Sequence, residues 1–317
     1  MEVNKVYQGD SSEMMKKLPD NFIDLTVTSP PYDNLRDYNG FKFDFETIAK
    51  ELFRITKEGG VVVWVVGDSV VNGSETTTSF KQAILFTEVG FNLHDTMIYE
   101  KSGFPFPMSN RYYQAFEYMF VFSKGKPKTV NLIEDRKNNY AGQKVARNHA
   151  LRMKDGSVIQ NSANKLDKNR KVKPYGVRLN IWRITNSSSK GDKIALQHPA
   201  TFPEQLAKDH IISWSNKGDL VFDPFAGSGT TLKMAMLNNR NYLGFEISAE
   251  YCNLINKRIG SNLSGFIRTS PEGDFSNEKE HNIGLKESSH EDSQISSNDE
   301  TSLNNNIQRL HNISQFV

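Results

Sequence analysis

The sequence has 317 residues, of which 37% are hydrophobic and 24% charged, and its formal net charge is +2. The length allows two domains, or one domain with an insertion and a tail. The single cysteine, Cys252, excludes a disulfide framework and a cysteine-rich zinc site, and we expect no metal. The first residues lack the basic and apolar blocks of a signal peptide, and no apolar run approaches the roughly 20 residues that span a bilayer. We therefore expect a soluble cytoplasmic protein.

The first 123 residues alternate between strand and helix patterns, which is typical of an α/β sheet. Predicted helices cover 11–18, with Ser11 or Ser12 as N-cap, 45–55, which Gly59-Gly60 would end, and 79–89. Predicted strands cover 3–7, 23–29, 61–66, 96–99 and 118–122. The run 61–66 is continuously apolar, which indicates a central strand covered on both faces.

Four residues, Ser29-Pro30-Pro31-Tyr32, follow the buried strand at 23–29. Two consecutive prolines remove two amide donors and exclude a helix, so the chain leaves the strand as a stiff turn. The carboxyl end of a strand is where α/β sheets bind their ligands. The motif would place hydrogen-bond acceptors beside an aromatic stacking surface there. Taken alone, the motif would favour an ordinary structural Pro-Pro turn with a packed Tyr.

Residues 124–193 are strongly basic, with 18 Lys or Arg against 5 Asp or Glu. This excess of 13 positive charges (18 − 5) is large for a solvated surface and indicates a polyanionic partner. Tyr140, Tyr175 and Trp182 lie among the basic residues, as on surfaces that stack on bases. We therefore predict a nucleic-acid-binding insert, with Arg111 from the preceding loop and the following insert residues as candidate contacts: Lys165, Lys168, Arg170, Lys171, Lys173 and Arg178.

After the insert the α/β pattern returns. Helices are predicted over 203–214, 230–237 and 249–259, and strands over 220–222 and 242–247. From about residue 262 the chain is rich in Ser, Asn and Glu and has few apolar residues, which predicts a disordered acidic tail over 262–317.

A glycine loop, Asp223-Pro224-Phe225-Ala226-Gly227-Ser228-Gly229-Thr230-Thr231, joins the strand at 220–222 to the next helix. Gly227 and Gly229 allow a tight turn and a close approach of a ligand to the amides of the helix N-terminus. The loop lacks the Gly-Lys-Ser/Thr of an ATPase, and Leu232 stands where a dinucleotide fingerprint has its third glycine. One strand later, Glu246 stands where this architecture binds ribose hydroxyls. Together these features predict a site for a nucleoside without phosphates.

The two motifs together resemble those of the S-adenosylmethionine-dependent DNA amino-methyltransferases, which methylate N4 of cytosine or N6 of adenine. The motif order, with the basic insert between Ser-Pro-Pro-Tyr and the glycine loop, resembles the permuted β class and covers residues 1 to about 260. It implies a class I methyltransferase (Rossmann-like) α/β fold with a seven-stranded, mostly parallel sheet. In the family's order, its strands would be 219–223, 242–247, 3–7, 23–29, 61–67, 95–101 and 117–122.

The resemblance also implies an organisation of the chain. A catalytic subdomain would cover 1–123, a target-recognition insert that binds DNA 124–193, and a cofactor-binding subdomain completing the same sheet 194–261. The cofactor would be S-adenosyl-L-methionine. Its predicted contacts are Asp10, His198, Asp223, Pro224, Phe225, Gly227, Gly229, Thr230 and Glu246. From the residues alone, Asp10 and the His198 segment could equally cap helices, and Asp223 could equally hold the loop amides.

The predicted catalytic residues are Ser29, Pro30, Pro31 and Tyr32. An exocyclic amine is a poor nucleophile because its lone pair is conjugated into the ring. The Ser29 hydroxyl and the Pro30 carbonyl would accept from the amine and stabilise the positive charge that develops on it, while Tyr32 stacks on the base. The base must be flipped out of the duplex to reach them. No covalent intermediate is needed, and the position of Cys252 in a late helix excludes C5-cytosine methylation.

The first residue of the tetrad bears on which base is methylated. In this family Ser at that position is commoner among N4-cytosine enzymes, so we expect a site-specific N4-cytosine methyltransferase of double-stranded DNA. N6-adenine is the alternative, and an RNA methyltransferase or an inert DNA-binding protein are remoter ones. The family implies a bacterial, archaeal or phage enzyme, often in a restriction-modification system with a partner endonuclease. The sequence leaves the recognition site and the oligomeric state open.

Overall fold

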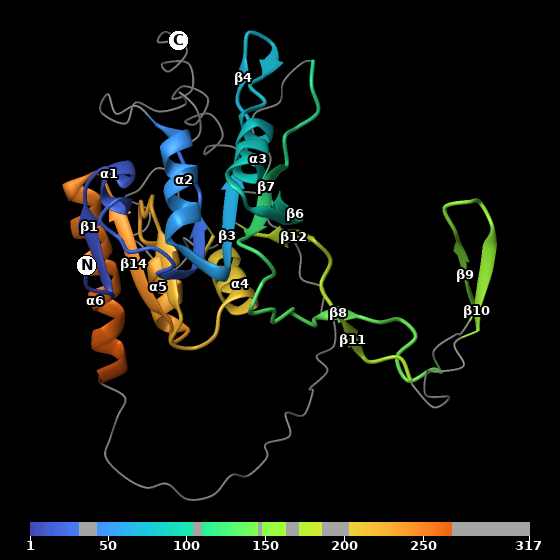
Figure 1. Ribbon diagram of the computed structural model, residues 1–317. Coiled ribbons are helices and arrows are strands. Elements are labelled where there is room, and N and C mark those ends of the chain that lie inside the picture. The colour runs from blue at the N-terminus through green and yellow to red at the C-terminus, as the bar shows by residue number, and fades with distance from the viewer. Residues whose placement is uncertain (32–42, 104–109, 145–147, 163–170, 186–202, 268–317) are drawn as a thin grey trace, which may run out of the picture. The chain divides into compact units, whose positions relative to one another are not determined.

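The computed structural model describes residues 1–31, 43–103, 110–144, 148–162, 171–185 and 203–267 (Figure 1). These residues belong to one compact unit, Met1–Ser270. Among them, no helix is both long and apolar enough to cross a membrane. Tyr32, His198, Lys165, Lys168, Arg170 and the predicted tail beyond residue 267 lie outside the described residues.

Eight of the described strands form one sheet in the order β1-β14-β13-β2-β3-β7-β6-β12. β7 is antiparallel to its neighbours β3 and β6, and the other neighbouring pairs are parallel. The seven strands expected from the family are all present, and β12 is an eighth. The strands are β1 (Lys5–Gln8), β2 (Ile23–Thr28), β3 (Thr56–Val66), β6 (Asn92–Lys101), β7 (Phe116–Ser123), β12 (Ile181–Ile184), β13 (Leu220–Asp223) and β14 (Asn241–Glu246).

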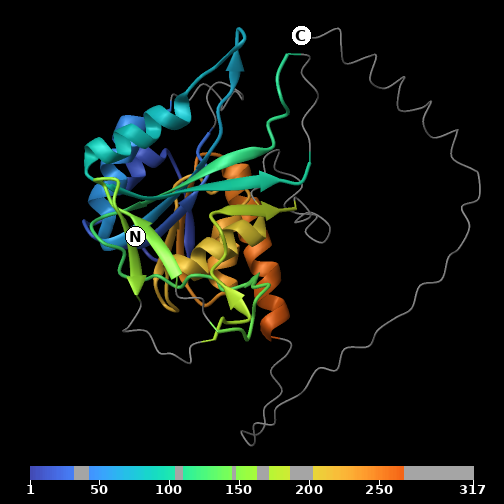
Figure 2. The same ribbon diagram turned by 90° about the vertical axis from the view of Figure 1, so that its right-hand side faces the viewer.

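Three of the described helices pack on each face of this sheet (Figure 2). One face packs against α1 (Ser11–Met15), α2 (Phe45–Ile55) and α3 (Thr78–Val89), and the other against α4 (Glu204–Trp214), α5 (Thr230–Leu237) and α6 (Ala249–Ile267). Along β3, Val61, Val63 and Val65 face the α4–α6 core, whereas Val62, Trp64 and Val66 face the α1–α3 core. This arrangement confirms the central strand that the continuous apolar run predicted.

The second helix does not end at a glycine, which corrects the prediction. α2 ends at Ile55 and the chain enters β3 directly at Thr56, whose amide still donates to the Leu52 carbonyl. Gly59 and Gly60 lie inside β3, near the point where its register with β2 shifts. Gly59 has a φ of +77°, and a Cβ on Gly60 would lie 2.9 Å from the Lys57 carbonyl. The two glycines therefore permit a bulge rather than a helix stop.

Two other boundaries differ from the prediction. The N-cap of α1 is Asp10 rather than Ser11 or Ser12, because the Asp10 carboxylate accepts from the amides of Ser12 and Glu13. At the other end of the chain, α6 continues to Ile267, so the helix extends into the range predicted as tail.

The basic range 124–193 is not wholly separate from the core. Its last strand, β12, pairs in parallel with β6 and forms one edge of the main sheet. The remaining described strands of the range form two antiparallel pairs, β8 (Arg136–Lys137) with β11 (Tyr175–Gly176) and β9 (Asn148–Arg152) with β10 (Val158–Ser162). Trp182 is buried in β12 and stacks on His210, 4.5 Å between ring centroids, so it is a core residue rather than a base-stacking one.

Candidate active site at the carboxyl edge of the sheet

The two sequence motifs meet because their strands are neighbours. β2 leads into Ser29, β13 leads into the glycine loop, and the two strands pair in parallel, with Leu25 opposite Val221. Their carboxyl ends therefore lie at the same edge of the sheet, which is toward the top of Figure 1. Pro30 is buried, and Ser29 and Pro31 are half-buried at this edge.

Asp223 links the two motifs through hydrogen bonds. Its Oδ1 accepts from Thr28 Oγ1 at 2.7 Å and from the Phe225 amide at 3.0 Å. Burial raises the pKa of Asp223 to about 6. The carboxyl group thus holds the start of the glycine loop against the strand that carries Ser29, and its contact with a cofactor remains a prediction.

The glycine loop has a backbone that other residues would not tolerate. Gly227 and Gly229 have φ values of +51° and +78°, in the left-handed region. A Cβ on Gly229 would lie 2.9 Å from the Ile255 side chain of α6. α5 begins directly after this turn, at Thr230. The loop therefore presents bare backbone at a helix N-terminus, as the sequence predicted.

Glu246 lies at the end of β14 and contacts this loop. Its Oε2 accepts from the Gly227 amide at 2.8 Å, and its Oε1 accepts from the Ser248 amide at 2.9 Å. The residue is buried, and this burial raises its pKa. A carboxylate has about four lone-pair sites, so it can accept further hydrogen bonds from hydroxyl groups of a ligand. Its chemistry and place suit the ribose of a nucleoside.

An ionic cluster around the buried Arg258, which the sequence did not lead us to predict, contacts the glycine loop from α6. Arg258 of α6 donates through Nη1 to the Ser228 carbonyl (2.8 Å) and to Thr230 Oγ1 (2.9 Å). Its Nη2 donates to Glu204 Oε1 at 2.7 Å, and the same oxygen accepts from Lys233 at 2.8 Å. Arg258 occupies an otherwise apolar face of its helix, after the buried Ile255 and next to the buried Ile259. A charged residue on an apolar helix face was the sequence signal that could have predicted this cluster.

Three other predicted cofactor residues, Asp10, Pro224 and Phe225, have partners within the protein. The Asp10 carboxylate caps α1, and the Pro224 carbonyl accepts from Ser11 Oγ. The Phe225 ring lies 5.6 Å from Phe43 and 6.2 Å from Trp64, between ring centroids, at the top of the α1–α3 core. Asp10 and Phe225 are thus near the carboxyl edge, and their contact with a cofactor remains a prediction.

The described basic residues that we predicted to bind DNA differ in their partners. Arg111 donates to the Gly73 carbonyl and lies 3.9 Å from Glu75. Lys173 pairs with Glu134 at 3.1 Å and stays largely exposed. Lys171 lies in a short β-bridge opposite Lys144, which brings two positive charges together.

Arg178 is the exception among these predicted contacts. Its guanidinium forms ion pairs with Asp135 and with the buried Asp209, and it lies 5.0 Å over the Trp182 ring. These contacts attach the insert to α4 and account for Arg178 structurally. We therefore leave it out of the proposed DNA surface.

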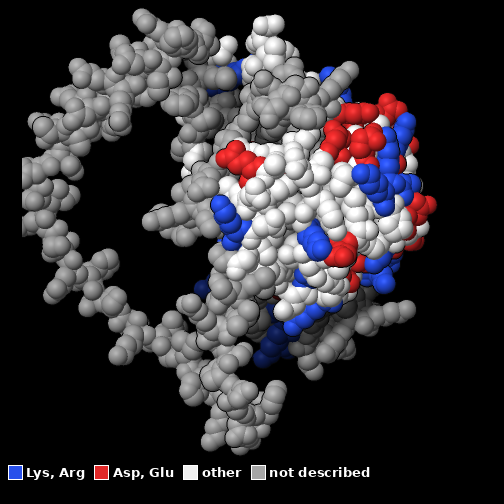
Figure 3. Space-filling view, turned by 90° about the vertical axis from the view of Figure 1, so that its left-hand side faces the viewer, with Lys and Arg blue, Asp and Glu red and all other residues white. Residues whose placement is uncertain are grey.

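Charge is mixed on the face that Figure 3 shows, where acidic and basic side chains lie next to one another. Pairs such as Lys16 with Glu13, 2.6 Å apart at the end of α1, are of this kind. A surface of mixed sign gives little net attraction for a polyanion, so a DNA surface is expected elsewhere.

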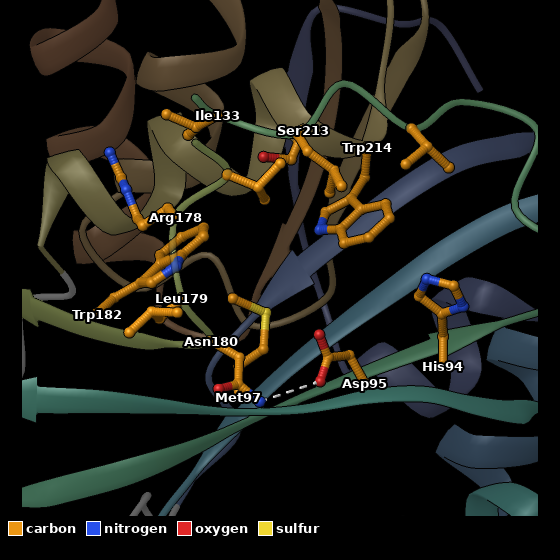
Figure 4. A pocket seen from close by; sticks show the side chains of 13 residues that line it. His94, Asp95, Met97, Ile133, Arg178, Leu179, Asn180, Trp182, Ser213 and Trp214 are labelled. Atoms are coloured by element: carbon orange, nitrogen blue, oxygen red, sulfur yellow. Dashed lines mark hydrogen bonds between the residues drawn. The ribbon is translucent and has the colours of Figure 1, made fainter. Parts of the chain in front are cut away.

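A cavity of about 270 Å³ lies at the opposite edge of the sheet, at the amino end of β6 (Figure 4). Segments 130–133 and 177–182, which connect the insert to the core, line it together with the end of α4. Asn180 donates to Asp95 across it at 3.5 Å, and the buried Trp214 indole N–H has no partner among the described residues. The cavity is thus a feature of the insert junction, distinct from the edge that carries Ser29.

Comparisons with known proteins agree with this geometry. A family model described as DNA methylase, N6_N4_Mtase, matches residues 23–257. Over 249 residues the chain is 62% identical to the orphan methyltransferase M.BamHII of Bacillus amyloliquefaciens, covering 78% of this chain and 92% of that protein.

Two solved structures share the fold. The PvuII DNA methyltransferase, described as cytosine-N4-specific, superposes with a TM-score of 0.59 at 23% identity, over 80% of this chain and 85% of that one. TTHA0409 of Thermus thermophilus, a putative DNA modification methylase solved in complex with S-adenosyl-L-methionine, gives a TM-score of 0.54 at 26% identity, over 83% of this chain and 95% of that one.

Proposed function

This chain belongs to the N6_N4_Mtase family of DNA methylases, and on that basis we propose that it methylates the exocyclic N4 of a cytosine flipped out of double-stranded DNA. The observation that carries the proposal is the junction of the two motifs. Thr28, which precedes Ser29, is hydrogen-bonded at 2.7 Å to Asp223, which opens the glycine loop. The Ser29 turn and the glycine loop thus lie side by side at one edge of one sheet, which supports the proposal that the first holds the base and the second the cofactor.

The residues of the loop fit the cofactor of this family, S-adenosyl-L-methionine. Gly227 and Gly229 leave the backbone accessible, and Glu246 offers a buried carboxylate for hydroxyl groups. Asp223, Phe225 and Thr230 would complete the cradle, with Asp10, Pro224 and His198 at its margin. When bound, the cofactor supplies a methyl group activated by its sulfonium.

Ser29 and Pro30 would act on the target amine. The Ser29 hydroxyl and the Pro30 carbonyl are acceptors fixed by the end of β2 and by two prolines, so they need no reorganisation when positive charge develops on nitrogen. Pro31 would keep the turn stiff and Tyr32 would stack on the base. This electrostatic preorganisation is the contribution we assign to the tetrad.

The choice of cytosine rests on Ser29. N4-cytosine enzymes of this family commonly carry Ser at this position. We further propose that Arg111, Lys171 and Lys173, with Lys165, Lys168 and Arg170, contact the DNA backbone. We also propose a partner restriction endonuclease.

Modified-base analysis of DNA from an expressing host tests the proposal. Digested plasmid DNA should contain N4-methylcytosine at one sequence motif, and DNA from a host expressing Ser29→Ala should contain far less. A host lacking endogenous methyltransferases provides the background. N6-methyladenine in place of N4-methylcytosine would overturn the assignment of the base, and no modified base at all would favour the inert DNA-binding protein.

A further inference from the structure

An ion pair lies at the carboxyl edge of the sheet, beside the proposed base site. Lys101 at the end of β6 and Glu117 near the start of β7 are joined by a contact of 2.6 Å between Nζ and Oε1. The Lys101 side chain is 30% exposed and the Glu117 side chain 15%. Partial burial of both charges costs desolvation free energy, which a further hydrogen bond to a ligand would offset.

The strand periodicity places this pair on the same face of the sheet as Ser29. Side chains two residues apart on a strand point to the same face. Val27, Met119 and Tyr99 all belong to the α4–α6 core. Ser29 lies two residues after Val27, Glu117 two residues before Met119, and Lys101 two residues after Tyr99. The side chains of all three are therefore expected on the α4–α6 face.

Gly67 separates Ser29 from the ion pair. It directly follows the end of β3, the strand between β2 and β7. Because Val66 pairs with Tyr118 in an antiparallel register, Gly67 comes level with Glu117. A Cβ on Gly67 would meet the Glu117 side chain at 3.5 Å. Glycine adds no side chain here, and β2 and β7 lie two strand spacings apart, roughly 10 Å, on either side of it. This width suits a single flat base.

We propose that Lys101 is a specificity-determining residue that donates a hydrogen bond to O2 of the flipped cytosine, and that Glu117 positions its ammonium group. The inference rests on the proposed function, in which Ser29 and Pro30 hold the N4 amine. In cytosine, O2 is an acceptor on the far side of the ring from N4. Adenine held by its N6 amine presents a C2–H there, which cannot accept a hydrogen bond.

The proposed contact would discriminate between the two bases. With adenine in the site, the Lys101 ammonium would lose an acceptor while remaining partly buried, and a donor left unpaired in this way is costly. Glu117 would hold the ammonium in place through their contact of 2.6 Å. Lys101 therefore selects the base through its O2 acceptor, whereas Ser29 and Pro30 hold the amine that both bases share.

The test uses the full-length protein and three variants on duplexes that contain its recognition site. Lys101→Met removes the donor and Glu117→Gln removes the charge that positions it. Lys57→Met is the matched control, because Lys57 pairs with Asp24 at 2.7 Å with comparable exposure, 42% and 22%, at the amino ends of β2 and β3. Each protein is assayed on the normal site and on a site with 2-thiocytosine at the target position, whose sulfur is a weaker acceptor than O2.

We expect Lys101→Met to lower kcat/KM on the normal site by about tenfold or more, Glu117→Gln by less, and Lys57→Met by less than about twofold. The affinity for S-adenosylmethionine should be unchanged in all three. The 2-thiocytosine substitution should slow the wild type and Lys57→Met but have little further effect on Lys101→Met, as expected for two changes to one contact.

An equal penalty from 2-thiocytosine in the wild type and Lys101→Met would overturn the inference, and so would equal losses in Lys101→Met and Lys57→Met. Because the 2-thiocytosine penalty is a ratio of two rates of the same protein, a smaller folded fraction of a variant does not change it. Formation of N6-methyladenine by the wild type would overturn the proposed function as well. If the product is N4-methylcytosine but 2-thiocytosine slows the wild type and Lys101→Met equally, the inference about Lys101 is overturned and the proposed function stands.

Discussion

Thr28 Oγ1 donates a 2.7 Å hydrogen bond to Oδ1 of Asp223, although 195 positions separate the two residues in the sequence. Both side chains are buried, and a second link, from Thr231 Oγ1 to the Val27 carbonyl at 3.1 Å, lies beside the first. The two bonds fix the turn that holds Ser29 relative to the glycine loop. In a transfer reaction between two bound molecules, such fixed geometry contributes directly to rate.

Replacement of Thr28 by Val should therefore destabilise the protein. The variant keeps the shape of the side chain but leaves the buried Asp223 carboxyl with one donor fewer, which we expect to cost about 1–3 kcal/mol in the free energy of unfolding. Thr28→Ser retains the hydroxyl and should lose less. Urea denaturation of the three proteins measures the difference, and equal stability of Thr28→Val and wild type would contradict the structural role.

Replacement of Ser29 by Ala should reduce catalysis without weakening cofactor binding. Loss of one preorganised polar group at a reacting centre typically lowers kcat by about 10²-fold or more. Single-turnover methylation of the site-containing duplex measures the effect, and calorimetry with S-adenosylmethionine provides the control. A variant that retains full kcat would show that Ser29 does not act on the amine.

Replacement of Glu246 by Gln should weaken binding of S-adenosylmethionine. The amide has one acceptor oxygen where the carboxylate has two, so the Gly227 and Ser248 amides cannot both keep their partner. We expect the Kd to rise by about tenfold or more. The exposed Glu250→Gln, with the same change of charge four residues later, should bind as the wild type does.

Replacement of Arg258 by Leu should both destabilise the fold and disturb the glycine loop. Removal of one partner from a buried ionic cluster costs about 3–5 kcal/mol, because the remaining polar groups lose their compensation. Arg258→Lys keeps the charge but not the fork that reaches Ser228, Thr230 and Glu204 together. It should therefore remain folded with a higher KM for the cofactor. The exposed Lys257→Leu should change neither property.

His210 should make the stability of the protein sensitive to acid. The ring is buried against Trp182, its Nδ1 has no partner among the described residues, and burial lowers its pKa to about 3. An unfolded chain binds a proton at this histidine below about pH 6.5, and the folded protein does not. The stability contribution is thus complete above pH 6.5 and falls with pH toward 3, by up to about 1.4 kcal/mol per pH unit.

His210→Gln should flatten this dependence in denaturation measured from pH 7 to pH 4. Asp223, whose raised pKa of about 6 favours the folded state as pH falls from 6 toward 4, acts in the opposite direction in both proteins and cancels in the comparison. Replacement of the exposed His94 by Gln is the control. Parallel pH profiles for wild type and His210→Gln would contradict the prediction.

Local patterns in the sequence determined most of the architecture. The run at 61–66 predicted a strand buried on both faces, because its five valines and one tryptophan leave no polar side chain to face solvent. α3 and α5 begin and end within one residue of their predicted bounds, since Gly90 and the glycine loop act within a single turn of the chain. The glycine loop and Glu246 were also predictable, because their backbone and position follow from the order of the strands.

Tertiary contacts decided what local patterns left open. Gly59 and Gly60 lie inside β3 rather than at a helix end, because pairing with the neighbouring strand β2 selects one of several locally acceptable conformations. The partners of Arg258, Arg178 and Lys101 come from other segments of the chain, and no local periodicity specifies such contacts. The sequence alone identified the two motifs, whereas the pairing of β2 with β13 brought Thr28 to Asp223 and made one site of them.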